Sequence, residues 1–199
     1  MARDFEGPSP GSWDSTRSGY ALANEEAAHA AFCLYFDIEV KEARVDSPIS
    51  EANVGGWVRT VPDTSTEGLE NHLKVTLAGP LATGREIPWP PSMHDGGDET
   101  VAARLVYILR YDKARWDEAV SFVRELLQFP TIQRAVKAIS GALLERGAIP
   151  GDELQAIVSD ARARSGARLE PSSPSDRAGG GFEPPSLHRP APPFPGGDA

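Results

Sequence analysis

The sequence is poor in cysteine and has no long apolar run, and each lack excludes a class of protein. Cys33 is the single cysteine among 199 residues, so no disulfide can form within the chain. No apolar run approaches the roughly 20 residues of a membrane-spanning helix. The segment from Met1 to Pro8 also lacks the apolar centre of a signal peptide. These absences predict a cytoplasmic protein, in a reducing compartment where a lone thiol is natural.

Basic residues are fewer than acidic ones. The chain has 20 Lys and Arg against 29 Asp and Glu, which gives a formal net charge of −9. A sequence-independent nucleic-acid binder needs a basic face, and an anionic membrane surface attracts basic segments. We therefore expect neither nucleic acid nor a membrane as a partner.

Two common catalytic motifs are also missing. There is no G-x-S-x-G nucleophile elbow. The stretch from Gly79 to Glu86 has the glycine spacing of a phosphate-binding loop, but Arg85 and Glu86 stand where lysine and serine or threonine are required. The sequence therefore predicts no ATPase within this chain.

The composition that remains is that of a soluble globular domain with biased ends. The chain is 40% hydrophobic and 25% charged, and its length suffices for one domain with a real core. Gly, Pro and Ser concentrate at both ends, where too few apolar residues remain to fold. We predict a flexible arm over residues 1–18, a helical domain over 19–164 and a disordered tail over 165–199.

Within that domain the pattern predicts a mainly α fold with a small β-ribbon. Alternating strands are expected over 38–45 and 54–60. Helices are expected over about 19–36, 67–83, from Asp98 to about 109, 113–128, 131–146 and 150–164. Pro80 should kink or divide the second helix, Gly147 should close the fifth, and Pro150 should begin the sixth.

The first predicted helix carries unusual polar residues. Its flanks are apolar on nearly every face, which indicates a buried helix. Two carboxylates and an imidazole in its middle are costly there unless something pairs with them. Helical rotation places Glu25, His29 and Cys33 in one row, with Glu26 beside it.

This E-E-x-x-H pattern is close to H-E-x-x-H, in which two histidines bind zinc and the glutamate is a general base. Alone, it also fits a plain helix with a hydrogen-bonded core histidine.

We expect Cys33 to be an ordinary core residue, and His72, on the second helix, to be a surface or boundary residue.

Three motifs in order resemble the peptidase domain of the FtsH-type zinc metallopeptidases, especially its short stand-alone relatives without the ATPase. Glu25–Ala30 stands where that family reads H-E-A-G-H-A. Leu77–Ala82 is similar to its L-A-G-x-x-A helix. Gly96-Gly97-Asp98 opens a helix where the family has its third zinc ligand, an aspartate. The likeness covers roughly Tyr20 to Ile157.

The resemblance implies a zincin-like helical domain with a metal centre. Glu26 would be the general base, and Glu25, His29 and Asp98 would be the metal ligands, with Glu25 departing from the family's histidine. His94, four residues before Asp98, could supply the missing imidazole, or it is an exposed loop residue. Asp98 could instead be a simple helix N-cap.

Glutamate at the first ligand position leaves three interpretations open. More ligand charge weakens Lewis acidity and favours harder ions, so zinc, manganese or no metal are all compatible. The first interpretation is a degenerate metallopeptidase, inactive or weakly active, that binds a peptide or protein segment. The second is a working metal-dependent endopeptidase, served by a separate ATPase motor or by flexible substrates. The third is an unrelated helical interaction domain.

Overall fold

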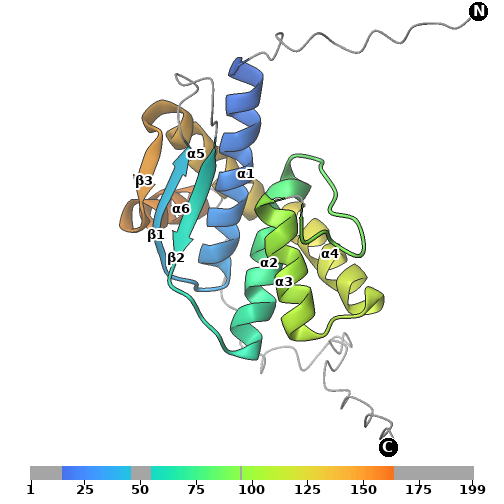
Figure 1. The fold of residues 1–199 in the computed structure, drawn as a ribbon. Helices are drawn as coiled ribbons and strands as arrows, with labels where there is room; N and C mark the ends of the chain where they lie inside the picture. Colours follow the sequence, from blue (N-terminus) through green and yellow to red (C-terminus); the bar gives the residue numbers. More distant parts are fainter. Residues whose placement is uncertain (1–14, 46–54, 95, 164–199) are drawn as a thin grey trace, which may run out of the picture. The chain divides into compact units, whose positions relative to one another are not determined.

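The computed structural model of the protein describes residues 15–45, 55–94 and 96–163. Within them the chain is mainly helical with a small antiparallel sheet, as the sequence predicts (Figure 1). The helices are α1 (Ser15–Tyr35), α2 (Thr66–Ala82), α3 (Gly97–Leu109), α4 (Lys113–Leu127), α5 (Pro130–Arg146) and α6 (Gly151–Ala163). The strands are β1 (Val40–Val45), β2 (Gly56–Thr60) and β3 (Ala148–Pro150). The predicted tail, 165–199, lies outside the described residues.

The sheet has the order β2-β1-β3, with both pairs antiparallel. The ribbon of β1 and β2 was predicted, whereas β3 was not, because a strand of three residues has no alternation to detect. Pro150 was predicted to begin the last helix; instead it ends β3 and pairs with Glu42. Helix α6 begins at Gly151, where a Cβ atom would overlap the carbonyl oxygen of Val40. Only glycine lets the helix start this close to β1.

Helix α1 is the centre of the core. Every residue from Glu26 to Cys33 is buried, as predicted for a helix that is apolar on nearly every face. Its alanines are small, which allows close approach by neighbouring helices. The helix packs most extensively against α5 and α2, and in Figure 1 it lies between the sheet on one side and α2, α3 and α4 on the other. It begins at Ser15, earlier than predicted.

Helix α2 runs unbroken through Pro80, so the predicted division does not occur. Proline has no N–H to donate to the carbonyl of Thr76, but only Leu81 and Ala82 follow it in the helix, so its effect is confined to the end of α2. The helix then ends in a Schellman-type cap. The Gly84 N–H donates to the Leu81 carbonyl (3.2 Å), the Arg85 N–H donates to the Pro80 carbonyl (2.9 Å), and Gly84 has φ +77°. This cap fixes where the Arg85 side chain starts.

No helix in the described ranges is both long and apolar enough to cross a lipid bilayer.

Helix α5 ends as predicted at Gly147, which has φ +75° and donates its N–H to the Leu143 carbonyl. Helix α3 begins directly after Gly96, and this places Asp98 in its first turn, facing α1 across the end of α2.

Candidate metal centre

Three predicted ligands lie together although they come from two distant parts of the chain. Glu25 and His29 are one turn apart on α1, and Asp98 is in the first turn of α3. One ligand atom from each residue lies within 4.8 Å of the other two. His29 Nε2 is 3.4 Å from Asp98 Oδ2. One nitrogen and two oxygens are a donor set that zinc or manganese accepts.

The ring of His29 is held in one orientation. Its Nδ1 donates to the carbonyl oxygen of Val75 at 2.8 Å, so that Nε2 turns toward Asp98. Metal-binding histidines usually make such a bond from the other ring nitrogen, because it fixes the tautomer and the ring plane. The side chain is buried. His29 is therefore arranged as a ligand would be, and it is also the hydrogen-bonded core histidine of the plainer interpretation.

The glycine of the Leu77–Ala82 motif makes room for this ring. A Cβ atom at Gly79 would overlap Nε2 of His29 and lie 2.8 Å from Cγ of Glu25. His29 and Glu25 can therefore pack this closely on α2 only because position 79 carries no side chain. The backbone of α2 at Gly79 thus lies directly against both predicted ligands.

Glu26, the predicted general base, lies beside these ligands and is only 6% exposed. Gly56 of β2 packs directly on its carboxyl group: a Cβ atom there would lie 2.5 Å from Glu26 Cγ and 2.7 Å from Oε1. Burial raises the pKa of Glu26 to about 7, and the nearby charges of Asp98 and Glu25 add to the rise while His29 opposes it. A carboxyl group with a pKa near 7 is suited to accept a proton at neutral pH.

The other carboxylates and the imidazole influence one another. Burial opposes the charge of His29, yet the hydrogen bond and the charge of Asp98 outweigh it and raise the pKa of His29 to about 9. Burial likewise opposes the charge of Asp98, but His29, Glu25 and Arg85 lower its pKa overall. Burial is the largest cause of the raised pKa of Glu25. Without a metal ion, the imidazolium of His29 and the carboxylate of Asp98 therefore form an ion pair.

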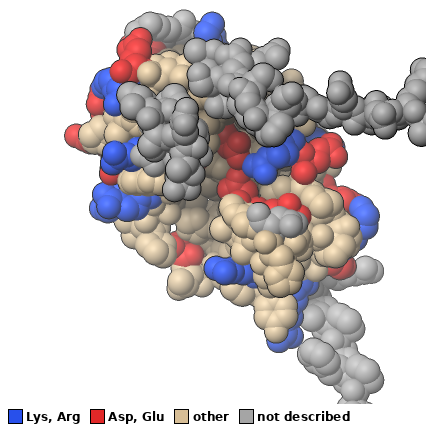
Figure 2. Space-filling view, turned by 45° about the horizontal axis from the view of Figure 1, so that its top comes forward, with Lys and Arg blue, Asp and Glu red and all other residues tan. Residues whose placement is uncertain are grey.

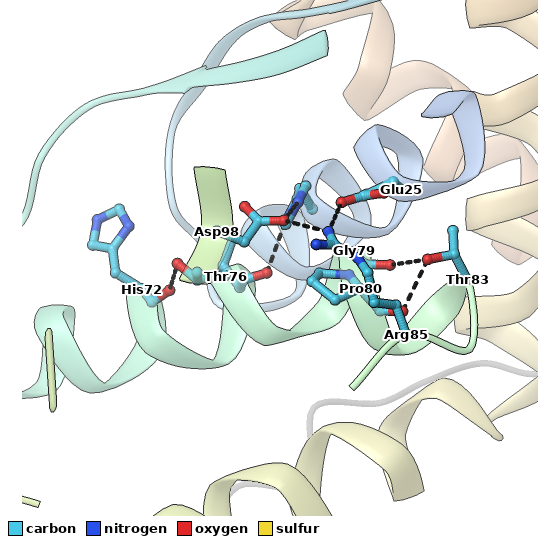
Figure 3. Close-up of polar contacts among 10 residues, drawn as sticks. Glu25, His72, Thr76, Gly79, Pro80, Thr83, Arg85 and Asp98 are labelled. Atoms are coloured by element: carbon cyan, nitrogen blue, oxygen red, sulfur yellow. Dashed lines mark hydrogen bonds and ion pairs between the residues drawn. The ribbon is translucent and has the colours of Figure 1, made fainter. Parts of the chain in front are cut away.

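Arg85 also belongs to the centre and was not predicted. Its Nη2 donates to Glu25 Oε1 at 2.5 Å and lies 3.6 Å from Asp98 Oδ2. Figure 3 shows the guanidinium group reaching from the end of α2 to both carboxylates. The sequence gives only a general hint: a largely buried carboxylate at position 25 needs a positive partner, but nothing in the pattern marks Arg85 as that partner.

The remaining candidates lie elsewhere or have other surroundings. His94 is exposed and outside the ligand cluster, so it does not replace the missing imidazole in this arrangement. Asp98 is not the N-cap of α3; that position is Gly96, without a side-chain cap bond. Cys33 is fully buried core, as expected. His72 is partly buried, and its Nε2 is buried with no hydrogen-bond partner in the structure.

The centre opens into a groove of about 530 Å³ between β2 and α3. Figure 2 shows a hollow in the face turned to the viewer, with acidic and basic groups adjacent at its edge. His29 and Glu26 line the inner part of the groove, next to Asp98. The walls come from both elements: Gly56, Trp57, Val58 and Thr60 on β2, and Gly97, Thr100, Val101 and Arg104 on α3.

No model of a known protein family matches this chain, and no curated protein matches its sequence.

Proposed function

We propose that the protein is a metallopeptidase-like binding protein of the FtsH type, with a zincin-like centre, whose groove takes an extended peptide segment without efficient hydrolysis. The observation that carries the proposal is the meeting of His29 and Asp98, 3.4 Å apart, beside a groove with a strand along its wall. The three motifs of the resemblance all contribute to this one place. In an unrelated helical bundle, these three motifs would not be expected to lie at one place.

The strand β2 supports peptide binding. It is at the edge of the described sheet, and four of its residues line the groove. An edge strand offers unpaired backbone donors and acceptors, to which an extended peptide can add as a further strand. Val101 faces it from α3 and is 44% exposed, so that the groove offers apolar contact to side chains of the bound segment.

Weak hydrolysis follows from the charges in the centre. Two of the three ligands are carboxylates, and the guanidinium group of Arg85 already contacts both of them. A metal ion held by more negative ligands is a weaker Lewis acid. Glu25 in place of histidine therefore favours a binding role over a catalytic one.

A working metal-dependent endopeptidase is the second candidate, and the buried Glu26 favours it. Glu25, His29 and Asp98 would hold zinc or manganese, which would polarise the peptide carbonyl and acidify a water molecule. Glu26 would accept the proton of that water, for which a pKa of about 7 is suitable. Such an enzyme would need flexible substrates or a separate ATPase motor to unfold them.

The metal content of protein purified without chelator separates the candidates. Stoichiometric zinc or manganese in the wild type that is lost in His29→Ala supports the endopeptidase. Metal-free wild type with unchanged folding supports the binding protein. In addition, Glu25→His restores the family's first ligand; cleavage of fluorescent casein gained by this change would show that the remaining machinery is intact.

Peptide binding is tested with fluorescently labelled, unfolded casein and fluorescence anisotropy. Val101→Arg places a charge in the groove and should weaken binding at least tenfold. Ile108→Arg is the matched control, because Ile108 is also exposed on α3 but does not line the groove. Equal binding by both variants, or no binding by the wild type, would reject the groove as the binding site.

A further inference from the structure

The position of Arg85 is set by the end of α2 rather than by a loose loop. The cap of α2 fixes its backbone through the Pro80 carbonyl, and that carbonyl also accepts from the Thr83 hydroxyl at 2.9 Å. The side chain therefore starts from a rigid point and extends back along α2 (Figure 3). Its reach to Glu25 spans 60 residues of sequence.

The guanidinium group contacts both carboxylates that would hold a metal ion. Glu25 Oε1 and Asp98 Oδ2 are the carboxylate oxygens that it contacts, at 2.5 Å and 3.6 Å. A zinc ion would bind such oxygens at about 2.0–2.2 Å. Two cations beside the same pair of carboxylates repel each other. Arginine and metal therefore cannot both make their best contacts with Glu25.

We propose that Arg85 is a tethered counter-cation that competes with a divalent metal ion for Glu25 and Asp98, and so sets the metal affinity of the centre. The proposal deepens the proposed function, since it names the residue that keeps the centre from full metal loading. Glu25 and Arg85 then act together. Glu25 brings a negative charge to a position where the family has a neutral histidine, and Arg85 neutralises that charge.

The test measures the affinity of metal-free protein for Zn²⁺ alone, by competition with a chromogenic chelator. Arg85→Gln should bind Zn²⁺ roughly tenfold more tightly than the wild type, because a competing positive charge is gone. Arg85→Lys keeps a charge and should stay within about threefold of the wild type. The matched control is Arg124→Gln, because Arg124 is an equally exposed arginine paired with Glu86 outside the centre; its affinity should be unchanged.

The second readout is thermal stability, starting from metal-free protein. In chelator-treated buffer, Arg85→Gln should have a lower Tm than the wild type, since Glu25 and Asp98 lose a positive partner. Adding Zn²⁺ should then raise the Tm of Arg85→Gln more than that of the wild type. Equal Zn²⁺ affinity of folded Arg85→Gln and wild type would overturn the proposal. Should Arg85→Gln fail to fold, Arg85→Met replaces it, with the same expected gain and the same overturning result.

Failure here and failure of the proposed function give different results. Casein binding that survives together with an unchanged Zn²⁺ affinity of Arg85→Gln would reject the role of Arg85 alone. Tighter Zn²⁺ binding by Arg85→Gln, combined with a wild type that binds no casein, would reject the peptide groove and keep the competition between arginine and metal.

Discussion

The imidazole of His29 lies directly on the backbone of Gly79, so close that a methyl group at position 79 would lie only 2.2 Å from Nε2. Gly79→Ala should therefore destabilise the protein by about 1–3 kcal/mol, as overpacked buried sites do, and should also displace Nε2 from Asp98. Urea unfolding measures the loss of stability, and chelator competition measures the accompanying loss of Zn²⁺ affinity.

Gly141 is the control for this change, because it also lies inside a helix but has no atom near its Cβ position. Gly141→Ala should stabilise the protein by about 0.5–1 kcal/mol, since alanine restricts the unfolded chain and favours helix. Stabilisation by Gly79→Ala of the same size would show that His29 is not held against α2.

Gly56 offers a test of the contact between β2 and the predicted base. Gly56→Ala pushes a methyl group into the carboxyl group of Glu26, and should cost about 1–3 kcal/mol. The neighbouring Gly55→Ala meets no atom within 4 Å and should change stability by less than about 0.5 kcal/mol. Equal effects of the two substitutions in thermal melts would contradict the close packing of Glu26 on β2.

Cys33 should be unreactive in the folded protein. It is fully buried, and burial raises the pKa of its thiol to about 12. The thiol therefore stays neutral at pH 8, and a neutral thiol is a poor nucleophile. Labelling with a thiol-specific disulfide reagent should therefore wait for unfolding and become rapid in urea. Fast stoichiometric labelling of native protein would contradict this prediction.

The start of α2 depends on one hydroxyl group. Ser65 Oγ accepts from the Gly68 N–H at 3.0 Å, which makes Ser65 the N-cap of α2. Ser65→Ala should cost about 1 kcal/mol of unfolding free energy. Thr64→Ala, at the exposed position just before it, should cost much less. A loss of Zn²⁺ affinity is not expected from either change, because the cap is at the opposite end of α2 from Arg85.

The helices were predictable because each one carries its own signals. Asp112 caps α4 and Gly147 closes α5, and such residues act locally. The burial of Glu26 and His29 was also indicated, since their neighbours on α1 are apolar on nearly every face. What local signals could not provide was the third strand, because its three residues become a strand only by pairing with β1.

The centre was only partly predictable. The motif on α1 and the row of Glu25 and His29 follow from helical spacing, whereas the meeting with Asp98 came from the family resemblance and not from composition. Arg85 was overlooked because its partner Glu25 lies far away in sequence, and an arginine after a helix end has no distinctive pattern. Long-range ion pairs of this kind leave no periodic signal along the chain.

Strand β1 is the middle strand of the sheet, so its two neighbours arrive at very different times during synthesis. β2 follows within a short stretch, but Ala148–Pro150 leaves the ribosome only after five of the six described helices have been made. Until then the edge of β1 that pairs with β3 is open. A chain shortened before Ala148 would keep that edge permanently, and exposed strand edges invite self-association.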